Sequence, residues 1–279
     1  MRPPRPPLVG RLLDRLPQPA TPWEDTAVPA EATGTRPVVL VHGTAGSRDN
    51  FERIVPLLRA TGRPVLSVSY GHRGTRELRD SLDEVVDQLT RITGRAGAVD
   101  LVGHSQGGLL ALAATGVVQG RTGGRPVGHV VGLAADFRGV GRPWFRPPES
   151  RLLHRLDRAL LPALADQLAG SPALAEVLPH TLRTDVPVTQ IITRGDRIVP
   201  AARARALAAP DPLTGLPAHP GPVRVVTVQE ERPDARIGHA MLPYHRIVGE
   251  LVAEALTTAP EVTAPRSPGH PTPCRRCRR

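Results

Sequence analysis

Short runs of apolar, often β-branched residues recur along the chain and alternate with longer segments in which apolar residues return every three or four positions. Six such runs are present: 37–41, 64–70, 99–105, 127–134, 186–193 and 223–229. Runs of this length with little polar alternation are typical of strands buried on both faces of a parallel sheet. We therefore predict a sheet of at least six strands.

The clearest helical pattern, TRELRDSLDEVVDQLTRITG, fills residues 75–94 between the second and third runs. One face carries the apolar positions Leu78, Leu82, Val85, Leu89 and Ile92. The opposite face carries Asp80, Asp83, Glu84 and Asp87, which we interpret as a solvated face and not as a metal site. Gly94 is expected to end the helix. Strands that alternate with such helices predict an α/β fold with a mostly parallel central sheet and helices on both faces.

The regular alternation defines the expected domain boundaries. Residues 1–35 are rich in Pro and Ala and predict an N-terminal arm, residues 36–258 predict one α/β domain, and residues 259–279 predict a disordered basic tail.

The longest interruption of the pattern is 136–185, between the fourth and fifth runs. It holds a loop rich in Pro and Arg, followed by Leu-rich helical pieces near 152–168 and 174–178. Because ligands bind beyond the carboxyl ends of the strands in open α/β sheets, we predict that this insertion forms a short helical cap. Trp144 and Phe145 then either line an acyl pocket or pack against the domain.

A polar residue among glycines follows the third run. In LVGHSQGGL the residues Gly103, His104, Ser105, Gln106 and Gly107 fit G-x-S-x-G, directly before the helical run LLALAATGVV. A sharp turn between strand and helix needs small neighbours, and it lifts the serine hydroxyl above the sheet at a helix N-terminus. We predict that Ser105 is a nucleophile; the alternative is a structural turn.

A serine nucleophile needs a base and an acid further along the chain, in the order Ser, Asp, His. Asp196 follows the fifth run and His239 follows the sixth. In this interpretation His239 takes the proton of Ser105, and Asp196 holds the imidazole in the required tautomer.

Other residues compete for these two roles. Asp185 precedes its strand and lies at the wrong end of the sheet, whereas Asp211 and Asp234 occupy Pro-rich loops. Asp234 is the serious alternative to Asp196. His245 is expected on the helix that follows His239.

The first strand runs into the sequence HGTAG, where a second donor for an oxyanion is expected. We assign the two oxyanion donors to the backbone N–H groups of Thr44 and Gln106. The neighbouring His42, Gly43 and His104 are expected to shape the loop and the turn.

The composition indicates which classes of binding partner to expect. The formal net charge is +10, all 36 basic residues are Arg, and they are scattered except in the tail PCRRCRR. Clustered cations would indicate phosphate binding, and the scatter favours compositional bias, so we predict no nucleic-acid partner. No stretch approaches the roughly 20 apolar residues that span a bilayer, and the N-terminal leucines are interrupted by charges. These features predict a cytoplasmic protein without membrane insertion.

The two cysteines, Cys274 and Cys277, both lie in the basic tail. A single C-x-x-C pair is half of a zinc site or a redox motif, but without a second pair we interpret it as two free thiols. No metal and no cofactor are predicted.

Four segments together resemble a triacylglycerol lipase/esterase family of actinobacteria within the α/β-hydrolase superfamily. They are PVVLVHGTAGSRDNFERIVPLLRATGRPVLSVSYG, VDLVGHSQGGLLAL, PALADQLAGSPALAEVLPHTLRTDVPVTQIITRGDRIVP and IGHAMLPYHRIVGELVAEAL. The resemblance covers about residues 22–257. It implies an α/β-hydrolase fold and hydrolysis of small-molecule or lipid carboxylic esters through an acyl-enzyme. It also implies the triad Ser105, Asp196 and His239, with Thr44 and Gln106 at the oxyanion hole.

This chain departs from that family in two ways. Members of the family are commonly exported and often disulfide-bonded, whereas this chain shows neither a leader nor cysteines in its core. The segment LAADFRGVGRP after the fourth run also differs from the His-Gly-Thr pattern of the family at that place. The same triad also suits a thioesterase, an amidase or an acyltransferase. A non-catalytic relative that keeps the pocket for binding is the alternative from another class.

Overall fold

Six parallel strands form the centre of the computed structural model, which describes residues 7–13, 15, 36–141 and 161–258. The strands are β1 (Val38–Val41), β2 (Val65–Val68), β3 (Val99–His104), β4 (Val127–Leu133), β5 (Val188–Ile192) and β6 (Val223–Thr227). Each lies within one of the six apolar runs, so the predicted strands are confirmed. All neighbouring pairs are parallel, where a mostly parallel sheet was expected.

The order of the strands, β2-β1-β3-β4-β5-β6, places the first strand between the second and the third. The chain therefore leaves β1 toward one edge of the sheet and returns on the other side of β1 to form β3. Such a reversal opens a crevice at the carboxyl ends of the two strands, where ligands bind in open α/β sheets. The loops after β1 and β3 lie at this crevice.

Successive strand residues face opposite sides of the sheet, and both sides are buried. In β1, Val39 and Val41 belong to the core on one side, whereas Val38 and Leu40 belong to the core on the other. This double burial explains why the strands read as uninterrupted apolar runs.

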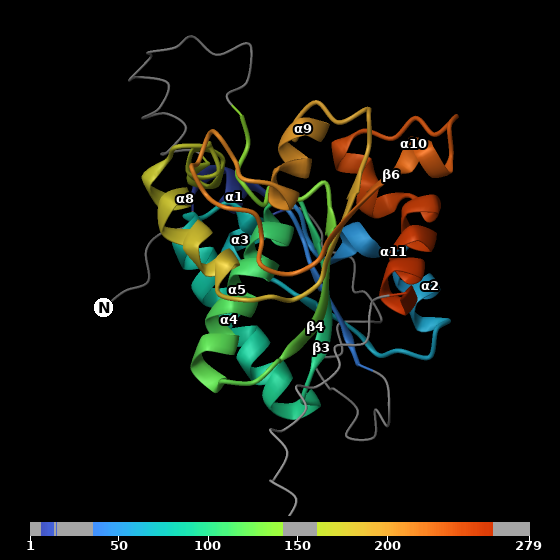
Figure 1. Ribbon diagram of the computed structural model, residues 1–279, viewed down its shortest axis with the longest axis horizontal. Helices are drawn as coiled ribbons and strands as arrows, with labels where there is room; N and C mark the ends of the chain where they lie inside the picture. Colours follow the sequence, from blue (N-terminus) through green and yellow to red (C-terminus); the bar gives the residue numbers. More distant parts are fainter. Residues whose placement is uncertain (1–6, 14, 16–35, 142–160, 259–279) are drawn as a thin grey trace, which may run out of the picture.

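Two layers of helices cover the sheet (Figure 1). One layer contains α4 (Leu78–Ala96), α5 (Gln106–Thr122), α8 (Pro172–Val177) and the 3-10 helix η2 (Leu178–Leu182). The other contains η1 (Arg48–Phe51), α2 (Val55–Arg59), η4 (His239–Tyr244) and α11 (Arg246–Thr258). The remaining short helices are α1 (Leu8–Leu13), α3 (Gly71–Gly74), α7 (Pro162–Asp166), α9 (Ala201–Ala204), η3 (Arg205–Ala208) and α10 (Val228–Glu231).

Helix α4 buries the predicted apolar face, but it does not end at Gly94. It continues to Ala96 and ends at Gly97, whose φ of 76° is the conformation that glycine adopts without a steric penalty. The acidic side of α4 is tied to Arg76, which pairs with Asp80 and lies 3.0 Å from Glu84. These acids are engaged in surface ion pairs, in keeping with a solvated face.

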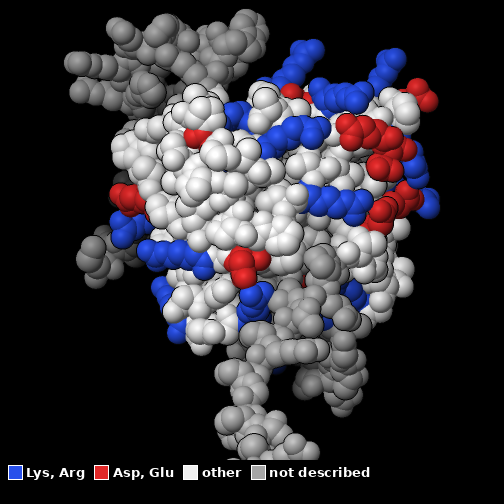
Figure 2. Space-filling model, viewed as in Figure 1, with Lys and Arg blue, Asp and Glu red and all other residues white. Residues whose placement is uncertain are grey.

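Acidic and basic side chains lie next to each other over β6, α10 and α11 (Figure 2). Two of the ion pairs there are Arg194–Glu230 at 3.7 Å and Arg224–Glu254 at 3.6 Å. Because these pairs are exposed, each contributes little to stability. On this face, the positive charge of each of these two arginines is partly balanced by a neighbouring glutamate.

Several predictions fall outside the described residues: most of the arm 1–35, the tail 259–279 with its two cysteines, and Trp144 and Phe145 in 142–160. Within the described segments, no helix is both long enough and apolar enough to cross a bilayer.

Candidate functional site

Ser105 stands at the turn between β3 and α5. Its φ of 52° and ψ of −128° are unfavourable for a residue with a side chain, a strain of about 1–3 kcal/mol. The turn is closed by two glycines: a Cβ at Gly103 would lie 2.5 Å from the Cα of Gly108, and one at Gly107 would lie 2.2 Å from the carbonyl oxygen of His42. Close backbone contact is thus the reason for glycine on both sides of Ser105.

His239 lies between Ser105 and Asp196 and contacts both. Its Nε2 is 2.9 Å from Ser105 Oγ, and its Nδ1 is 2.7 Å from Asp196 Oδ2. The serine hydroxyl can donate to Nε2 while Nδ1–H donates to the carboxylate, which is the tautomer that a base acting on the serine requires. All three residues are at most 8% exposed. The three side chains predicted to form the triad therefore lie in one hydrogen-bonded chain.

The loop after β5 fixes the Asp196 carboxylate. Its Oδ1 accepts hydrogen bonds from the backbone N–H groups of Ile198 and Val199, each at 2.8 Å. The remaining oxygen, Oδ2, is thereby left to face His239. A carboxylate with this many donors keeps one orientation, and that orientation aligns the imidazole.

The competing acids and the competing base lie in different settings. Asp185 is half exposed and pairs with Arg125, Asp234 is exposed, and Asp211 is buried against Arg203 at 2.7 Å. His245 was expected on the helix that follows His239, and this prediction was wrong. It lies between η4 and α11, where its Nδ1 accepts a hydrogen bond from the N–H of Ile247 at 3.3 Å. The 3-10 helix η4, which begins at His239, was also not predicted. Because η4 occupies residues 239–244, the following helix α11 begins only at Arg246.

His104 contacts His239 through both a hydrogen bond and its ring. Its Nε2–H donates to the carbonyl oxygen of His239 at 3.1 Å, and the two rings lie 4.9 Å apart. Burial, aided by the nearby charge of His239, lowers the pKa of His104 to about 3. His104 is therefore neutral near pH 7 and holds the backbone of residue 239 in place.

The HGTAG loop after β1 runs against the nucleophile. A Cβ built at Gly43 would lie 3.1 Å from the Cβ of Ser105, so the loop backbone passes directly beside the turn. His42 is buried at the start of this loop, and its Nδ1 lies 3.0 Å from the carbonyl oxygen of Gly43. Burial lowers the pKa of His42 to about 4, so this ring too is neutral near pH 7.

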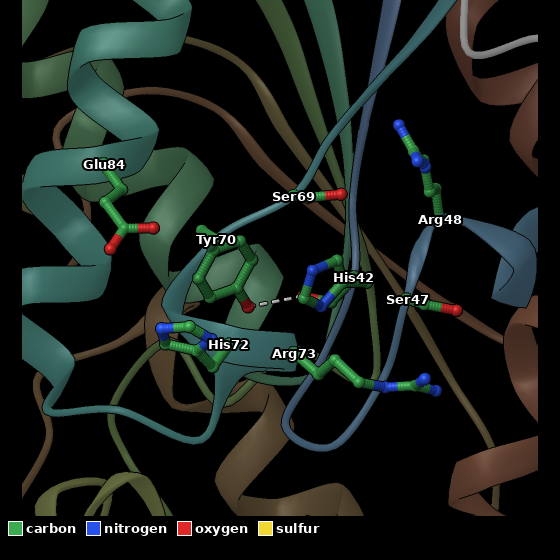
Figure 3. A pocket seen from close by; sticks show the side chains of 8 residues that line it. All are labelled: His42, Ser47, Arg48, Ser69, Tyr70, His72, Arg73 and Glu84. Atoms are coloured by element: carbon green, nitrogen blue, oxygen red, sulfur yellow. Dashed lines mark hydrogen bonds between the residues drawn. The ribbon is translucent and has the colours of Figure 1, made fainter. Parts of the chain in front are cut away.

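Tyr70, at the end of β2, joins this loop to the start of α5, a role that the sequence analysis missed. Its hydroxyl donates to the carbonyl oxygen of His42 at 2.6 Å (Figure 3). The same hydroxyl lies 3.1 Å from Oε1 of Gln106. The rings of Tyr70 and His42 stack at 4.4 Å. Both predicted oxyanion segments are thus held by one buried phenol.

A cavity of about 320 Å³ is lined by residues that follow β1, such as His42, and by residues that follow β2, such as Tyr70 and Arg73 (Figure 3). Its lining, taken from the described residues, does not include Ser105, Asp196 or His239.

Gln167 links the segment between β4 and β5 to the same loop. Its Nε2 donates to Thr44 Oγ1 at 2.9 Å and to the carbonyl oxygen of Ala163 at 2.7 Å. Gln167 is 2% exposed. Nothing in its sequence context distinguished it from the surrounding helical residues, because the contact spans 123 positions.

Asp136, three residues beyond β4, was also missed. It is 1% exposed, and neither carboxyl oxygen has a hydrogen-bond partner on another residue of the described segments. Burial raises its pKa to about 6, against smaller opposing effects of its own backbone N–H and of His239. The position directly after an apolar strand was the available signal.

Asp136→Asn is expected to stabilise the protein at pH 8. The pKa of Asp136 is about 6 in the folded state and near 3.8 in the unfolded chain, so the folded state binds this proton more tightly. Ionisation as the pH rises from 4 to above 6 therefore costs about 3 kcal/mol of folding stability, which asparagine avoids. Urea unfolding at pH 8 and pH 4 should show a gain at pH 8 that vanishes at pH 4. An equal gain at both values would contradict this assignment.

Within the described residues no group of three or more His, Cys, Asp or Glu side chains is arranged to hold a metal ion.

Residues 38–271 match the model of the alpha/beta hydrolase family, and the protein belongs to this family. A search of curated protein sequences gives no significant match. Among solved structures, lipase B of Aspergillus fumigatus is similar with a TM-score of 0.63 at 17% identity, over 84% of this chain and 55% of that one. The chain thus spans about half the length of that lipase.

Two further structures show the same fold. A monoacylglycerol lipase of Paleococcus ferrophilus has a TM-score of 0.54 at 15% identity, over 80% of this chain and 96% of that one. A structure from work on LipS and LipT, two metagenome-derived lipolytic enzymes, has a TM-score of 0.53 at 16% identity, over 80% and 94%. The expected α/β-hydrolase fold is confirmed.

Proposed function

We propose that this protein is a serine hydrolase of carboxylic esters that works through an acyl-enzyme. The observation that carries the proposal is the position of His239, with Nε2 at 2.9 Å from Ser105 Oγ and Nδ1 at 2.7 Å from Asp196 Oδ2. The lipases among the similar structures support an ester substrate, as does the resemblance to the actinobacterial lipase/esterase family.

In the proposed reaction, Ser105 Oγ attacks the ester carbonyl as His239 Nε2 accepts its proton. The imidazolium, stabilised by the Asp196 carboxylate, then gives this proton to the departing alkoxide, and the alcohol leaves. Water repeats the sequence: it loses a proton to His239, attacks the acyl-serine and releases the acid, and the proton returns to Ser105. Neither step needs a metal or a cofactor.

The N–H groups of Thr44 and Gln106 are the proposed donors to the oxyanion. Gln106 is the first residue of α5, where free N–H groups and the helix dipole favour negative charge. Gly43 lies beside Ser105, and this supports the assignment of the neighbouring Thr44 N–H as a donor. We extend the proposal to residues 136–185 as a cap, since Gln167 from this segment contacts Thr44.

Tyr70→Phe should lower kcat about tenfold with little change in KM, because the buried hydroxyl that contacts both oxyanion segments is lost. Steady-state kinetics with a p-nitrophenyl ester measure this split. Tyr244, the second of the two tyrosines, is half-buried in η4 and offers Tyr244→Phe as the matched control. A kcat of Tyr70→Phe equal to that of the control would remove the assigned role.

The test of the function is a fluorophosphonate probe, which phosphonylates an activated serine. We expect labelling of the wild-type protein at Ser105, and no labelling of Ser105→Ala. A panel of p-nitrophenyl esters of rising chain length beside acyl thioesters then assigns the substrate class. Absence of labelling in folded wild-type protein would refute the proposal, and a preference for thioesters would change the substrate class.

A further inference from the structure

Asp136 differs from every other buried acid in the described part of the chain. Five aspartates are buried there: Asp100, Asp136, Asp166, Asp196 and Asp211. Asp100 pairs with Arg36 and Arg63, Asp166 accepts from a backbone N–H, Asp196 contacts His239, and Asp211 pairs with Arg203. Neither carboxyl oxygen of Asp136 has a hydrogen-bond partner on another of the described residues.

The backbone places Asp136 at the rim that carries the nucleophile. Strand β4 is paired with β3 up to His104, and the N–H of Ser105 donates to the carbonyl oxygen of Leu133 at 3.0 Å. Ala135 lies against the first turn of α5, where its Cβ would be 2.3 Å from a Cβ at Gly108. Asp136 is the next residue, so it follows directly on the contact with this turn.

Its carboxyl group lies within electrostatic range of His239 and Tyr70. Burial is the main cause of the raised pKa of both Asp136 and Tyr70; charge on His239 opposes the shift at Asp136, and charge on Asp136 adds to the shift at Tyr70. His239 cannot satisfy the carboxylate, because its two nitrogens already face Ser105 and Asp196. Tyr70 cannot do so either, since its hydroxyl proton goes to the His42 carbonyl at 2.6 Å.

A buried carboxyl without a partner is costly, and such groups in native proteins are concentrated at functional sites. A hydrogen-bond donor on the bound substrate would pair with the Asp136 carboxyl, and the energetic cost of the unpaired group would then be removed only in the enzyme–substrate complex. A hydroxyl suits it better than an ammonium group, because an ammonium would itself have to lose its hydration on entering the buried site.

We propose that Asp136 accepts a hydrogen bond from a hydroxyl group that the substrate carries close to its ester carbonyl, which makes the enzyme selective for hydroxylated esters. This proposal rests on the ester hydrolase function proposed above and specifies its substrate class. Asp136 then discriminates between substrates by the bond that a deoxy analogue cannot make.

Two matched pairs of esters test the proposal. p-Nitrophenyl 3-hydroxybutyrate against p-nitrophenyl butyrate places the hydroxyl on the acyl side, and 2-hydroxyethyl butyrate against propyl butyrate places it on the alcohol side. For at least one pair, the wild-type kcat/KM should favour the hydroxylated member by about 10- to 100-fold, the effect of one hydrogen bond to a carboxylate. The responding pair identifies the side.

The same ratio is then measured in Asp136→Leu, which has a similar volume and no polar atom, and in Asp185→Leu as the control. Asp185 precedes β5 at the opposite end of the sheet and is half exposed. The ratio should fall to about one in Asp136→Leu and stay at the wild-type value in Asp185→Leu. If Asp136→Leu does not fold, Asp136→Asn decides, since its neutral amide oxygen is a weaker acceptor and must lower the ratio.

Two results would overturn the proposal. One is a wild-type ratio near one for both pairs. The other is a preference that survives in Asp136→Leu or, where that variant does not fold, a ratio in Asp136→Asn that equals the wild-type value. Either leaves ester hydrolysis intact. Failure of the proposed function is a different result, namely wild-type protein that hydrolyses none of the four esters and takes no fluorophosphonate label.

Discussion

Replacing Ser105 by alanine is expected to lower kcat by about six orders of magnitude, and His239→Ala by a similar factor. Both side chains serve one event, the transfer of a proton from Oγ to Nε2 across 2.9 Å as the carbonyl is attacked. When either is missing, only substrate binding and the oxyanion donors remain, and these supply about 10³–10⁴-fold over water. The remaining activity should therefore not be zero.

The double variant is the sharper part of this prediction. Because the two residues act as a unit, Ser105→Ala combined with His239→Ala should be no slower than either single variant. kcat is measured on p-nitrophenyl butyrate with protein purified to remove traces of wild type. Independent roles would instead give a double variant whose loss is the product of the two single losses.

Ser69→Ala is the matched control for the nucleophile. Ser69 follows β2 at the same edge of the sheet and is exposed, whereas Ser105 is buried with its hydroxyl against His239. Its replacement should leave kcat within about twofold of wild type, as expected of a surface substitution. A loss in Ser69→Ala comparable to that in Ser105→Ala would mean that the assignment of the nucleophile is wrong.

The second large effect concerns folding: Gly107→Ala should destabilise the protein by more than about 4 kcal/mol or prevent folding. A methyl group there would lie 2.2 Å from the carbonyl oxygen of His42 and 2.3 Å from that of Val41. Both atoms belong to the backbone at the end of β1, which is held between β2 and β3 and cannot move aside.

Gly120, on the same helix, is the control because a Cβ there meets nothing within 4 Å. Gly120→Ala should raise stability by up to about 1 kcal/mol through helix propensity. The two variants thus make the same chemical change on one helix, and we expect opposite effects on the free energy of unfolding. Urea unfolding followed by circular dichroism measures both, and a Gly107→Ala variant as stable as wild type would show that α5 does not sit so close to β1.

The sequence was a good guide wherever one segment carried the whole signal. The six strands, α4 and the turn at Ser105 could be predicted because burial on two faces, helical spacing and tight backbone contact each leave a local pattern. The errors were local as well. Gly94 was taken as a helix end, but helical hydrogen bonding tolerates one glycine, and the left-handed residue that ends α4 is Gly97.

The residues that the sequence analysis missed are those defined by a distant contact. Gln167 meets Thr44 across 123 positions, and Tyr70 lies 36 positions from Gln106. Asp136 matters because of what it lacks, and the absence of a partner is not visible in a sequence. Composition and spacing describe a residue's own element, whereas these roles depend on its neighbours in space.

By itself the sequence determined the class of fold, the glycine-bound turn that presents Ser105, and the order of candidate residues along the chain. Only the tertiary structure decided that His239 meets Ser105 across 134 positions and Asp196 across 43, and that Asp136, beyond the carboxyl end of β4, is buried without a partner on another described residue. The physical reason is that strand order brings the carboxyl ends of β3, β4, β5 and β6 to one edge of the sheet, and that order is set by packing of the whole sheet.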